Sequence, residues 1–384
     1  MVPSPQTLRE HYRAFLKPGR ILLTGHSHQA WPDCARQGVL EALNDAAIHV
    51  DDKWQRAEIK ANTVRQSVAD SLGVQAVEIA LAQSSHELAV RFLSGLDWSK
   101  SKHIVTTDGE FHSLRRQLDR LEELGLEVTR VAAQPIETLA SRLSDALRSD
   151  SLALMVSTVL FQTATIVPNL RLAIEAAHHC GAVVYLDAYH GFRAMPTPIA
   201  DLGPDPIFIS SGGYKYAQWG EGCCWMRIPP SSIMRPAYTG WFAEFAQLDD
   251  PPGGGVGYAS DGAHAFAGST YDPTSHYRAA EVIAFFQSQG LTDSVLRHIS
   301  LRQTQRIMTQ LPDLACLTPH SAQLRGGFVA FRTPHAKQLV RELRARNIFT
   351  DSRGDILRLG PAPYLTDDDI DQACLTLKHL LKSI

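Results

Sequence analysis

Short apolar runs alternate with longer amphipathic segments along most of this chain. Runs bounded by polar or glycine residues are typical of buried strands. The predicted strands are 77–81, 102–106, 127–131, 152–157, 182–187, 206–209 and 327–331. The predicted helices, from periodic apolar positions and glycine or proline stops, are 6–16, 35–72, 87–93, 136–148, 170–180 and 279–290. This alternation indicates an α/β protein with a mostly parallel sheet covered by helices.

The chain is long enough for more than one domain. At 384 residues it exceeds the size at which a single hydrophobic core stops growing. We predict a large domain at 30–262 and a small C-terminal domain at 263–384, with 1–29 packing beside it. No internal repeat or low-complexity tract interrupts this division.

The first candidate for chemistry is Lys215. It follows an apolar run and the pair Gly212-Gly213, and it lies between Tyr214 and Tyr216. A desolvated lysine amine with a lowered pKa can form a Schiff base with a carbonyl cofactor, of which pyridoxal 5′-phosphate (PLP) is the usual one. Such a site also needs a carboxylate for the pyridine nitrogen and donors for the phosphate. Taken alone, Lys215 also fits an ordinary loop lysine.

Asp187 supplies the expected carboxylate. It ends the predicted strand 182–187, and ligands bind at the carboxyl ends of strands in open α/β sheets. Paired with the pyridine nitrogen, its carboxylate would keep that nitrogen protonated, so that the ring can accept electrons. The alternative for Asp187 is a turn or a helix cap.

Ser84 and Ser85 are the candidate phosphate ligands. They precede the predicted helix 87–93, and a helix N-terminus attracts anions through its free N–H groups and its dipole. A plain serine N-cap is the alternative.

These motifs resemble a known family. Asp187-x-x-His190, followed by Tyr214-Lys215-Tyr216 and a glycine-rich tail, is similar to the fold-type I, class V aminotransferase superfamily and, within it, to kynureninase. The resemblance runs from about Ile21 to the C-terminus. It implies a large PLP-binding domain with a mostly parallel sheet of the seven-stranded type and a smaller α+β C-terminal domain.

The resemblance implies roles around the cofactor. Phe111 matches an aromatic residue that stacks on the pyridine ring, and Gln162 and Thr163 are candidates for a contact to the 3′-oxygen. His190 would lie near the cofactor, with a structural histidine as the alternative. Tyr214 would bind the phosphate or donate a proton. Catalysis would then rest on Lys215, Asp187 and Tyr214.

Other positions match substrate contacts in the family. Arg358 matches the arginine that takes the substrate α-carboxylate through a bidentate pair. Trp241, within Gly240-Trp241-Phe242, matches a tryptophan near an aromatic substrate. Ser27 and His28 lie where kynureninases carry a loop near the substrate. The implied partner is a small-molecule substrate that is an amino acid.

The segment 266–273 implies a second subunit. In the family this segment comes from the neighbouring chain and touches the phosphate, so Ser269 and Thr270 are assigned to the cofactor. The implied assembly is a homodimer with active sites at the interface.

Some positions depart from kynureninase and leave the reaction open. Leu114 stands where kynureninases carry an aspartate, and Thr270 stands where they carry an asparagine. A PLP-dependent hydrolase that cleaves a Cβ–Cγ bond and releases alanine is the first hypothesis. A class V aminotransferase or a lyase acting on another amino acid is the alternative. Two further alternatives are a cysteine desulfurase, for which Cys316 lies in an apolar context, and an inactive PLP-binding homologue.

Composition agrees with a soluble enzyme of small molecules. Hydrophobic residues make up 44% and charged residues 20%, the formal net charge is −3, and no basic run suggests nucleic acid or a membrane surface. No apolar run approaches the ~18 residues of a membrane span. The 6 cysteines are scattered, which indicates reduced thiols in a cytoplasm, and the 16 histidines show no metal-binding spacing. We therefore expect a cytoplasmic enzyme without a catalytic metal.

Overall fold

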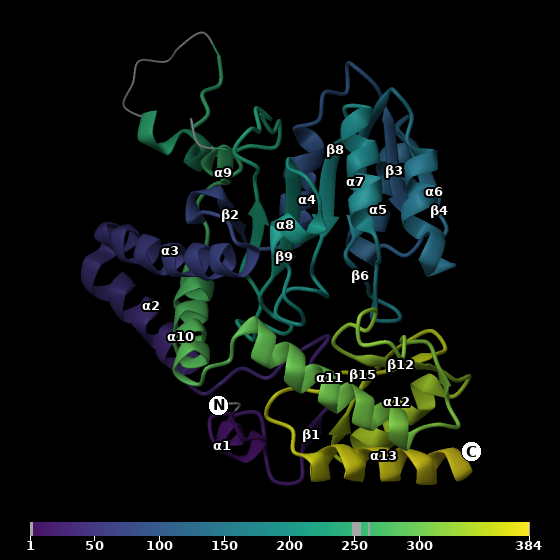
Figure 1. Ribbon diagram of the computed structural model, residues 1–384. Helices are drawn as coiled ribbons and strands as arrows, with labels where there is room; N and C mark the ends of the chain where they lie inside the picture. Colours follow the sequence, from purple (N-terminus) through teal and green to yellow (C-terminus); the bar gives the residue numbers. More distant parts are fainter. Residues whose placement is uncertain (1–2, 248–254, 260–261, 384) are drawn as a thin grey trace.

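The structure is a computed structural model that describes residues 3–247, 255–259 and 262–383. One large sheet with its helices forms the upper part of the molecule in Figure 1. The chain from α11 onward and the N-terminal segment lie together below it. The N-terminal segment and the C-terminal part of the chain are therefore neighbours in space.

The large sheet has the strand order β2-β10-β9-β8-β5-β3-β4. Its strands are β2 (Ile79–Ala82), β3 (His103–Thr107), β4 (Glu127–Val131), β5 (Ser151–Ser157), β8 (Val183–Asp187), β9 (Ile207–Gly212) and β10 (Cys224–Arg227). The strands from β4 to β9 run parallel, whereas β10 is antiparallel to both of its neighbours. The prediction of a mainly parallel, seven-stranded sheet is confirmed.

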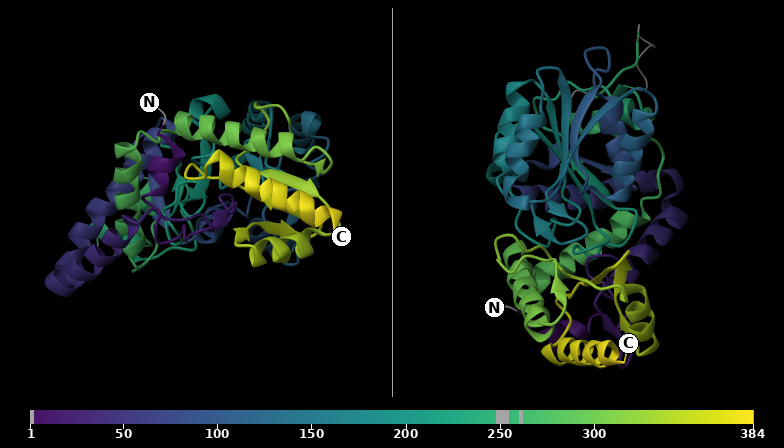
Figure 2. Two further views of the ribbon diagram at one scale, coloured as in Figure 1. Left: turned by 90° about the horizontal axis from the view of Figure 1, so that it is seen from below. Right: turned by 90° about the vertical axis from the view of Figure 1, so that its right-hand side faces the viewer.

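Helices cover both faces of this sheet (Figure 2). Strand β5 shows why both faces need to be covered, because its successive side chains point to opposite faces of the sheet and are apolar. Leu154 packs in one apolar cluster with Ile174 of α7, and Met155 packs in another with Phe92 of α4. Because both faces are buried, β5 is apolar without alternation, as its sequence indicated.

The helices form the rest of the scaffold. They are α1 (Pro5–Arg9), α2 (Ala35–His49), α3 (Lys53–Leu72), α4 (Ser85–Ser94), α5 (His112–Glu122), α6 (Leu139–Ala146), α7 (Leu170–His179), α8 (Ile199–Leu202), α9 (Gly262–Ala265), α10 (Thr274–Ser288), α11 (Asp293–Gln310), α12 (Ala336–Ala345) and α13 (Asp367–Lys382). α10 follows the predicted boundary at 262/263 and packs on α2 and α3. The predicted domain boundary stays a prediction.

Short strands join the two ends of the chain. β1 (Ile21–Leu22) pairs in parallel with β13 (Ile348–Phe349), and Thr24 bridges to Gly360. The second sheet has the order β11-β12-β15-β14, with β11 (Ala315–Cys316), β12 (Val329–Arg332), β14 (Asp351–Arg353) and β15 (Ile356–Leu359). A hairpin of β6 (Val159–Leu160) and β7 (Thr165–Ile166) completes the strands.

Two predicted helices are wrong in extent. The helix expected at 6–16 ends at Arg9, because the Asp33 carboxylate accepts hydrogen bonds from the backbone N–H groups of Arg13 and Ala14 at 2.9 Å. The helix expected at 35–72 is interrupted at Val50, whose φ is 51°. In both places a tertiary or backbone constraint overrides helical periodicity.

The helices and the cysteines bear on the class of protein. No helix in the described ranges is long and apolar enough to cross a membrane. All six cysteines are free thiols.

The contact between Tyr12 and Gln218 ties the N-terminal segment to the loop after Lys215. The Tyr12 hydroxyl donates to Gln218 Oε1 at 2.5 Å, and both side chains are fully buried. Tyr12→Phe should lower the free energy of unfolding by about 1–3 kcal/mol, because it leaves a buried amide oxygen unpaired. Urea unfolding measures this loss. Tyr238→Phe, at a residue that is 55% exposed, is the control and should change stability by less than about 0.5 kcal/mol. Equal stabilities of the two variants would contradict the assignment.

Candidate active site

A cavity of about 270 Å³ lies where β5, β8 and β9 end. Its position is the carboxyl edge of the parallel sheet, the usual ligand site in such folds. The lining residues are Gln83, Ser84, Ser85, His86, Ala89, Phe111, Ser113, Leu114, Ser157, Val159, Phe161, Tyr185, Asp187, Tyr189, His190, Tyr214, Lys215, Glu221, Gly222 and Cys224. Many of the predicted site residues are in this set.

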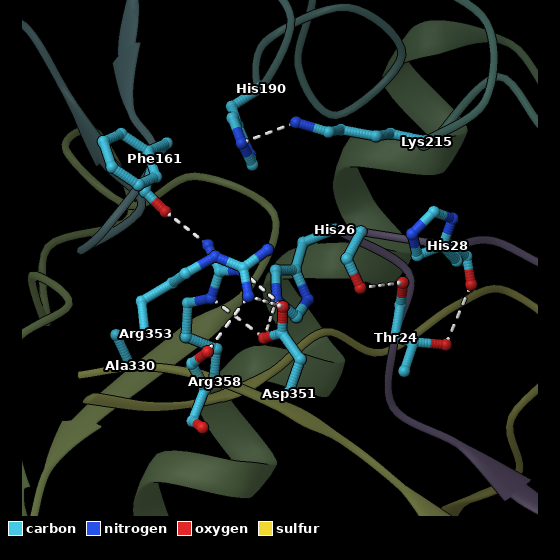
Figure 3. A network of polar contacts seen from close by, with 12 residues as sticks. Thr24, His26, His28, Phe161, His190, Lys215, Ala330, Asp351, Arg353 and Arg358 are labelled. Carbon is cyan, nitrogen blue, oxygen red and sulfur yellow. Dashed lines mark hydrogen bonds and ion pairs between the residues drawn. The ribbon is translucent and has the colours of Figure 1, made fainter. Parts of the chain in front are cut away.

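The loop after β9 carries Lys215 into the cavity. A Cβ atom at Gly213 would lie 2.5 Å from the Trp219 ring, so only glycine allows this close approach. The Trp219 N–H donates to the Gly213 carbonyl at 2.8 Å and closes the loop. Lys215 Nζ lies 2.6 Å from His190 Nε2 and 4.7 Å from the centre of the Tyr189 ring. Figure 3 shows the lysine and His190 pointing toward each other.

Burial controls the protonation of this pair. Desolvation lowers the pKa of the Lys215 amine from 10.5 to about 7, while the Asp187 carboxylate opposes the shift and Arg358 adds to it. Burial also lowers the pKa of His190 well below its usual value, so its imidazole is neutral and accepts the hydrogen bond from Lys215. The site thus holds a lysine that is readily available as a neutral nucleophile.

Asp187 ends β8 beside Lys215 in the same cavity. In the sheet it pairs with Ser157 of β5 and Ser210 of β9, and its Oδ1 accepts a hydrogen bond from the Tyr189 N–H at 2.8 Å. Burial raises the pKa of the Asp187 carboxyl, and the Tyr189 N–H and Lys215 oppose that shift. A cationic ring nitrogen placed here would stabilise the carboxylate further.

The N-terminus of α4 forms another wall of the cavity. Ser84 caps this helix, with its Oγ accepting a hydrogen bond from the Glu87 N–H at 3.2 Å. Ser84 and Ser85 both line the cavity, as does Gly222. Their hydroxyl and backbone donors, with the positive end of the helix dipole, suit a phosphate.

Aromatic side chains enclose the space between these walls. Lys215 Nζ lies 5.5 Å from the centre of the Phe111 ring and 5.6 Å from the centre of the Tyr214 ring. Burial raises the pKa of the Tyr214 phenol to about 12, so the group remains protonated and able to donate. His28 stacks on Tyr214 with ring centres 5.7 Å apart. Ser27 does not line this cavity; its hydroxyl donates to the Thr24 carbonyl at 3.2 Å.

Other predicted residues lie outside the cavity of this chain. Gln162 is exposed, and the Thr163 hydroxyl bonds to Thr165 Oγ1 at 2.7 Å. Ser269 and Thr270 are exposed, and Trp241 is 44% exposed. Their assignments to the cofactor and the substrate stay predictions.

Arg358 lies just beyond the cavity with most of its donors engaged. It is on β15, and its Nε donates to Asp351 Oδ1 at 2.9 Å while Nη2 bonds to the other oxygen. Its Nη1 donates to the Phe161 carbonyl at 2.8 Å, and His26 Nε2 lies 2.9 Å from Asp351 Oδ1. Burial acts to raise the pKa of Asp351, but the hydrogen bonds and charges of His26 and Arg358 hold it well below its usual range. Figure 3 shows this network facing Lys215.

Glu110 is a site residue that the sequence analysis missed. Its carboxylate accepts hydrogen bonds at 2.6 Å from the hydroxyls of Thr107 and Ser157, and Ser157 lines the cavity beside Asp187. Burial raises the pKa of the Glu110 carboxyl to about 7, opposed by those hydrogen bonds. The signal in the sequence was an acidic residue next to Phe111. The sequence did not show that the Glu110 side chain points into the fold toward Ser157. Asp351 was missed for the same reason.

The residues present fit PLP. His190 Nδ1 is buried without a hydrogen-bond partner, and His190 is the one hydrogen-bond partner of Lys215 Nζ in the described part of the chain. One cavity combines this lysine, a carboxylate at a strand end, an aromatic ring and a helix N-terminus. No group of three or more His, Cys, Asp or Glu side chains in the described ranges is arranged to hold a metal ion.

The chain is similar to several known proteins. A family model described as "Kynureninase C-terminal domain" matches residues 287–377. An uncharacterized aminotransferase, YcbU of Bacillus subtilis, is 20% identical, with 95% of this chain and 96% of that protein covered. Kynureninase of Deinococcus radiodurans is 26% identical, with 97% and 93% covered. A solved structure of a C-DES variant, with glycine covalently linked to its PLP cofactor, superposes with a TM-score of 0.83 at 18% identity, covering 96% and 98% of the two chains.

Together the sequence similarities, the fold and the site define a PLP-dependent enzyme of fold type I with the class V aminotransferase architecture. The predicted superfamily, the enzymatic nature of the chain and PLP as its cofactor are confirmed at this level. Within that class, the C-terminal part of the chain is kynureninase-like.

The Lys215 amine should react as a neutral nucleophile near neutral pH. In the cofactor-free protein, labelling of Lys215 by formaldehyde and cyanoborohydride should be half-maximal near pH 7, because burial lowers the pKa of the amine to about 7. Asp187→Asn should move this midpoint to lower pH, since the carboxylate stabilises the ammonium form. Peptide mass spectrometry measures the labelling. Asp150→Asn is the control, because Asp150 directly precedes β5 and so lies at the edge of the sheet away from the cavity. A labelling midpoint that moves equally in both variants would refute the pairing of Lys215 with Asp187.

Glu110 should make stability depend on pH. Its pKa is 4.5 in an unfolded chain and about 7 in the fold, so the folded state holds the proton more tightly. The free energy of unfolding of the wild type, relative to that of Glu110→Gln, should therefore fall as the pH rises from about 4.5 to about 7. Above about pH 7 the difference should stay constant. The steepest loss is about 1.4 kcal/mol per pH unit. Urea unfolding across this pH range tests it, and a difference between the two proteins that is constant with pH would contradict it.

Proposed function

We propose that this chain is a PLP-dependent hydrolase of amino acids with kynureninase-like activity, cleaving a Cβ–Cγ bond and releasing alanine. The observation that carries the proposal is the pairing of Lys215 with Asp187 in one buried cavity, together with the kynureninase similarity of residues 287–377. The similarity to kynureninase across 97% of this chain supports the choice among reactions of the class.

Lys215, Asp187 and Tyr214 divide the work at the reacting atoms. The bound cofactor supplies an electron sink for the carbanion that forms when a bond to the substrate α-carbon breaks. The Lys215 amine, neutral near pH 7, removes the α-proton and returns it. Asp187 holds a proton on the ring nitrogen. Water would add to the γ-carbonyl carbon, which then leaves as the carboxylic acid. The protonated Tyr214 phenol would donate a proton to the β-carbon, which stays on the released alanine.

Arg358 can take the substrate carboxylate without releasing Asp351. A guanidinium has five N–H donors, and Asp351 and the Phe161 carbonyl engage three of them. One donor on Nη1 and one on Nη2 are left for the carboxylate. The Arg358 side chain is only 3% exposed, which strengthens such an ion pair by excluding water.

A second copy of the chain would complete the site. Trp241 and Phe245 are 44% and 58% exposed, and their ring centres lie 5.3 Å apart, so they form an aromatic surface. The Phe242 N–H donates to the Gly268 carbonyl at 3.0 Å, so this surface lies beside Ser269 and Thr270. An apolar surface next to the segment assigned to a neighbouring phosphate site supports the proposal of a homodimer with shared active sites. A cytoplasmic location stays a prediction.

The alternatives differ at particular residues. An aminotransferase or lyase would use the same Lys215 and Asp187, and Leu114 in the cavity wall favours a substrate without a cation near that position. A cysteine desulfurase would need a reactive thiol near the cofactor. The Cys316 thiol does not line the cavity, donates to the Thr318 carbonyl at 3.4 Å, and has its pKa raised by burial. An inactive homologue would bind PLP and turn over no amino acid.

Turnover of L-kynurenine is the test. The PLP-loaded enzyme should release alanine and an aromatic acid in equal amounts, and Lys215→Ala should abolish both products. Lys100→Ala, at a surface lysine whose side chain is 77% exposed, is the matched control and should keep full activity. Chromatography of the two products measures the ratio. A PLP-loaded wild type that forms no aromatic acid would refute the hydrolase and favour an aminotransferase or a lyase.

A further inference from the structure

A second cavity, of about 360 Å³, lies between the N-terminal segment and the C-terminal part of the chain. The lining residues are Phe15, Arg20, Leu22, Thr24, Ser27, His28, Ala30, Arg344, Phe349, Thr350, Asp351 and Arg353. It adjoins the active site, because Asp351 bonds to Arg358 and His28 stacks on Tyr214. In Figure 3, Thr24 and His28 lie on one side of Asp351 and Arg353 on the other.

The charges around this second cavity are unbalanced. It is lined by Arg20, Arg344 and Arg353, and its single acid is Asp351. The Asp351 carboxylate is already engaged by Arg358, and Arg353 Nη1 is 3.6 Å from it. Arg20 and Arg344 have no acidic partner in the described part of the chain. A concave surface with an excess of one charge attracts counter-ions of the other.

Two polar groups at this cavity lack partners. Thr350 is 1% exposed, and its hydroxyl makes no hydrogen bond within the described ranges. The Nε of Arg20 is likewise buried and unpaired. Buried polar groups are normally paired, because an unmade hydrogen bond is unfavourable. Both groups are donors, and an anionic ligand would satisfy them.

The remaining walls are apolar. Phe15, Leu22 and Ala30 come from the N-terminal segment, and Phe349 comes from β13. The guanidinium carbons of Arg20 and Arg344 each lie 5.5 Å from the centre of the Phe349 ring. An inorganic anion would leave these apolar walls unused, whereas an organic anion would cover them. The volume suits a small organic molecule.

We propose that this second cavity binds a small organic carboxylate with an aromatic or aliphatic body. The body packs against Phe15 and Phe349, and the carboxylate is held by the guanidinium groups of Arg20 and Arg344 and by the Thr350 hydroxyl. This site is separate from the cavity of Lys215. Its existence does not depend on the reaction proposed above.

Calorimetric titration of the PLP-loaded enzyme with benzoate tests the site. The wild type should show saturable binding, and Arg344→Gln should weaken it roughly tenfold through the loss of a charge-assisted pair. Thr350→Val should also weaken binding by several-fold while raising the melting temperature of the ligand-free enzyme, since it removes an unpaired buried hydroxyl. Arg346→Gln is the matched control. Arg346 is two residues away, pairs with Glu342 and does not line the cavity, so its loss should leave binding unchanged.

Three outcomes would overturn the proposal. Equal benzoate affinity in Arg344→Gln and Arg346→Gln would show that the second cavity is not the binding site. Loss of binding in Arg358→Gln with none in Arg344→Gln would place benzoate in the cavity of Lys215. If inorganic phosphate binds at the same arginines more tightly than benzoate does, the site is one for an inorganic anion and not for an organic carboxylate. The readout is heat of binding rather than turnover, so failure here is distinct from failure of the proposed reaction.

Discussion

Burial of the Lys215 amine beside Asp187 is the constraint on which the active site depends. Desolvation favours the neutral amine, and the neighbouring carboxylate opposes it, so the pKa of the lysine falls near neutrality rather than far below it. The sheet makes this balance possible. β8 and β9 are adjacent and parallel, so the residue that ends one strand and the loop that leaves the other meet at one edge. The glycine at 213 lets that loop close over Trp219.

Buried polar networks hold the walls of the site in place. Arg358 and Asp351 are paired so closely that removing either would leave a buried charge without its partner. His26, from the N-terminal segment, bonds to the same carboxylate, so that segment and the hairpin of β14 and β15 meet at Asp351. On the opposite side, Glu110 fixes Ser157 next to Asp187. The geometry at the cofactor therefore depends on carboxylates that lie behind the first layer of side chains.

The class of enzyme and the reaction are decided by different parts of the molecule. The lysine, the strand-end carboxylate and the helix N-terminus come from the sheet and its first helices, and they are common to a fold that supports several chemistries. The residues expected to select the substrate lie outside this common set, such as Leu114 in α5 and His28 in the N-terminal segment. The C-terminal part, where the kynureninase similarity is found, carries Arg358, which bonds to the carbonyl of Phe161 in the cavity wall.

The sequence by itself determined the α/β class, the parallel strands and the pair Lys215 and Asp187, because buried strands are continuous apolar runs and strand ends collect functional groups. It also placed Ser84, Ser85, Phe111, His190 and Tyr214 in positions that the structure brings to one cavity. Only the tertiary structure decided the rest. Periodicity continued past Arg9 and Val50, but a contact to Asp33 and a residue with positive φ ended those helices. The pairing of Arg358 with Asp351 depends on the register of the hairpin between β14 and β15, and the direction of Glu110 depends on Ser157, which lies far from it in sequence. Neither was readable in the chain.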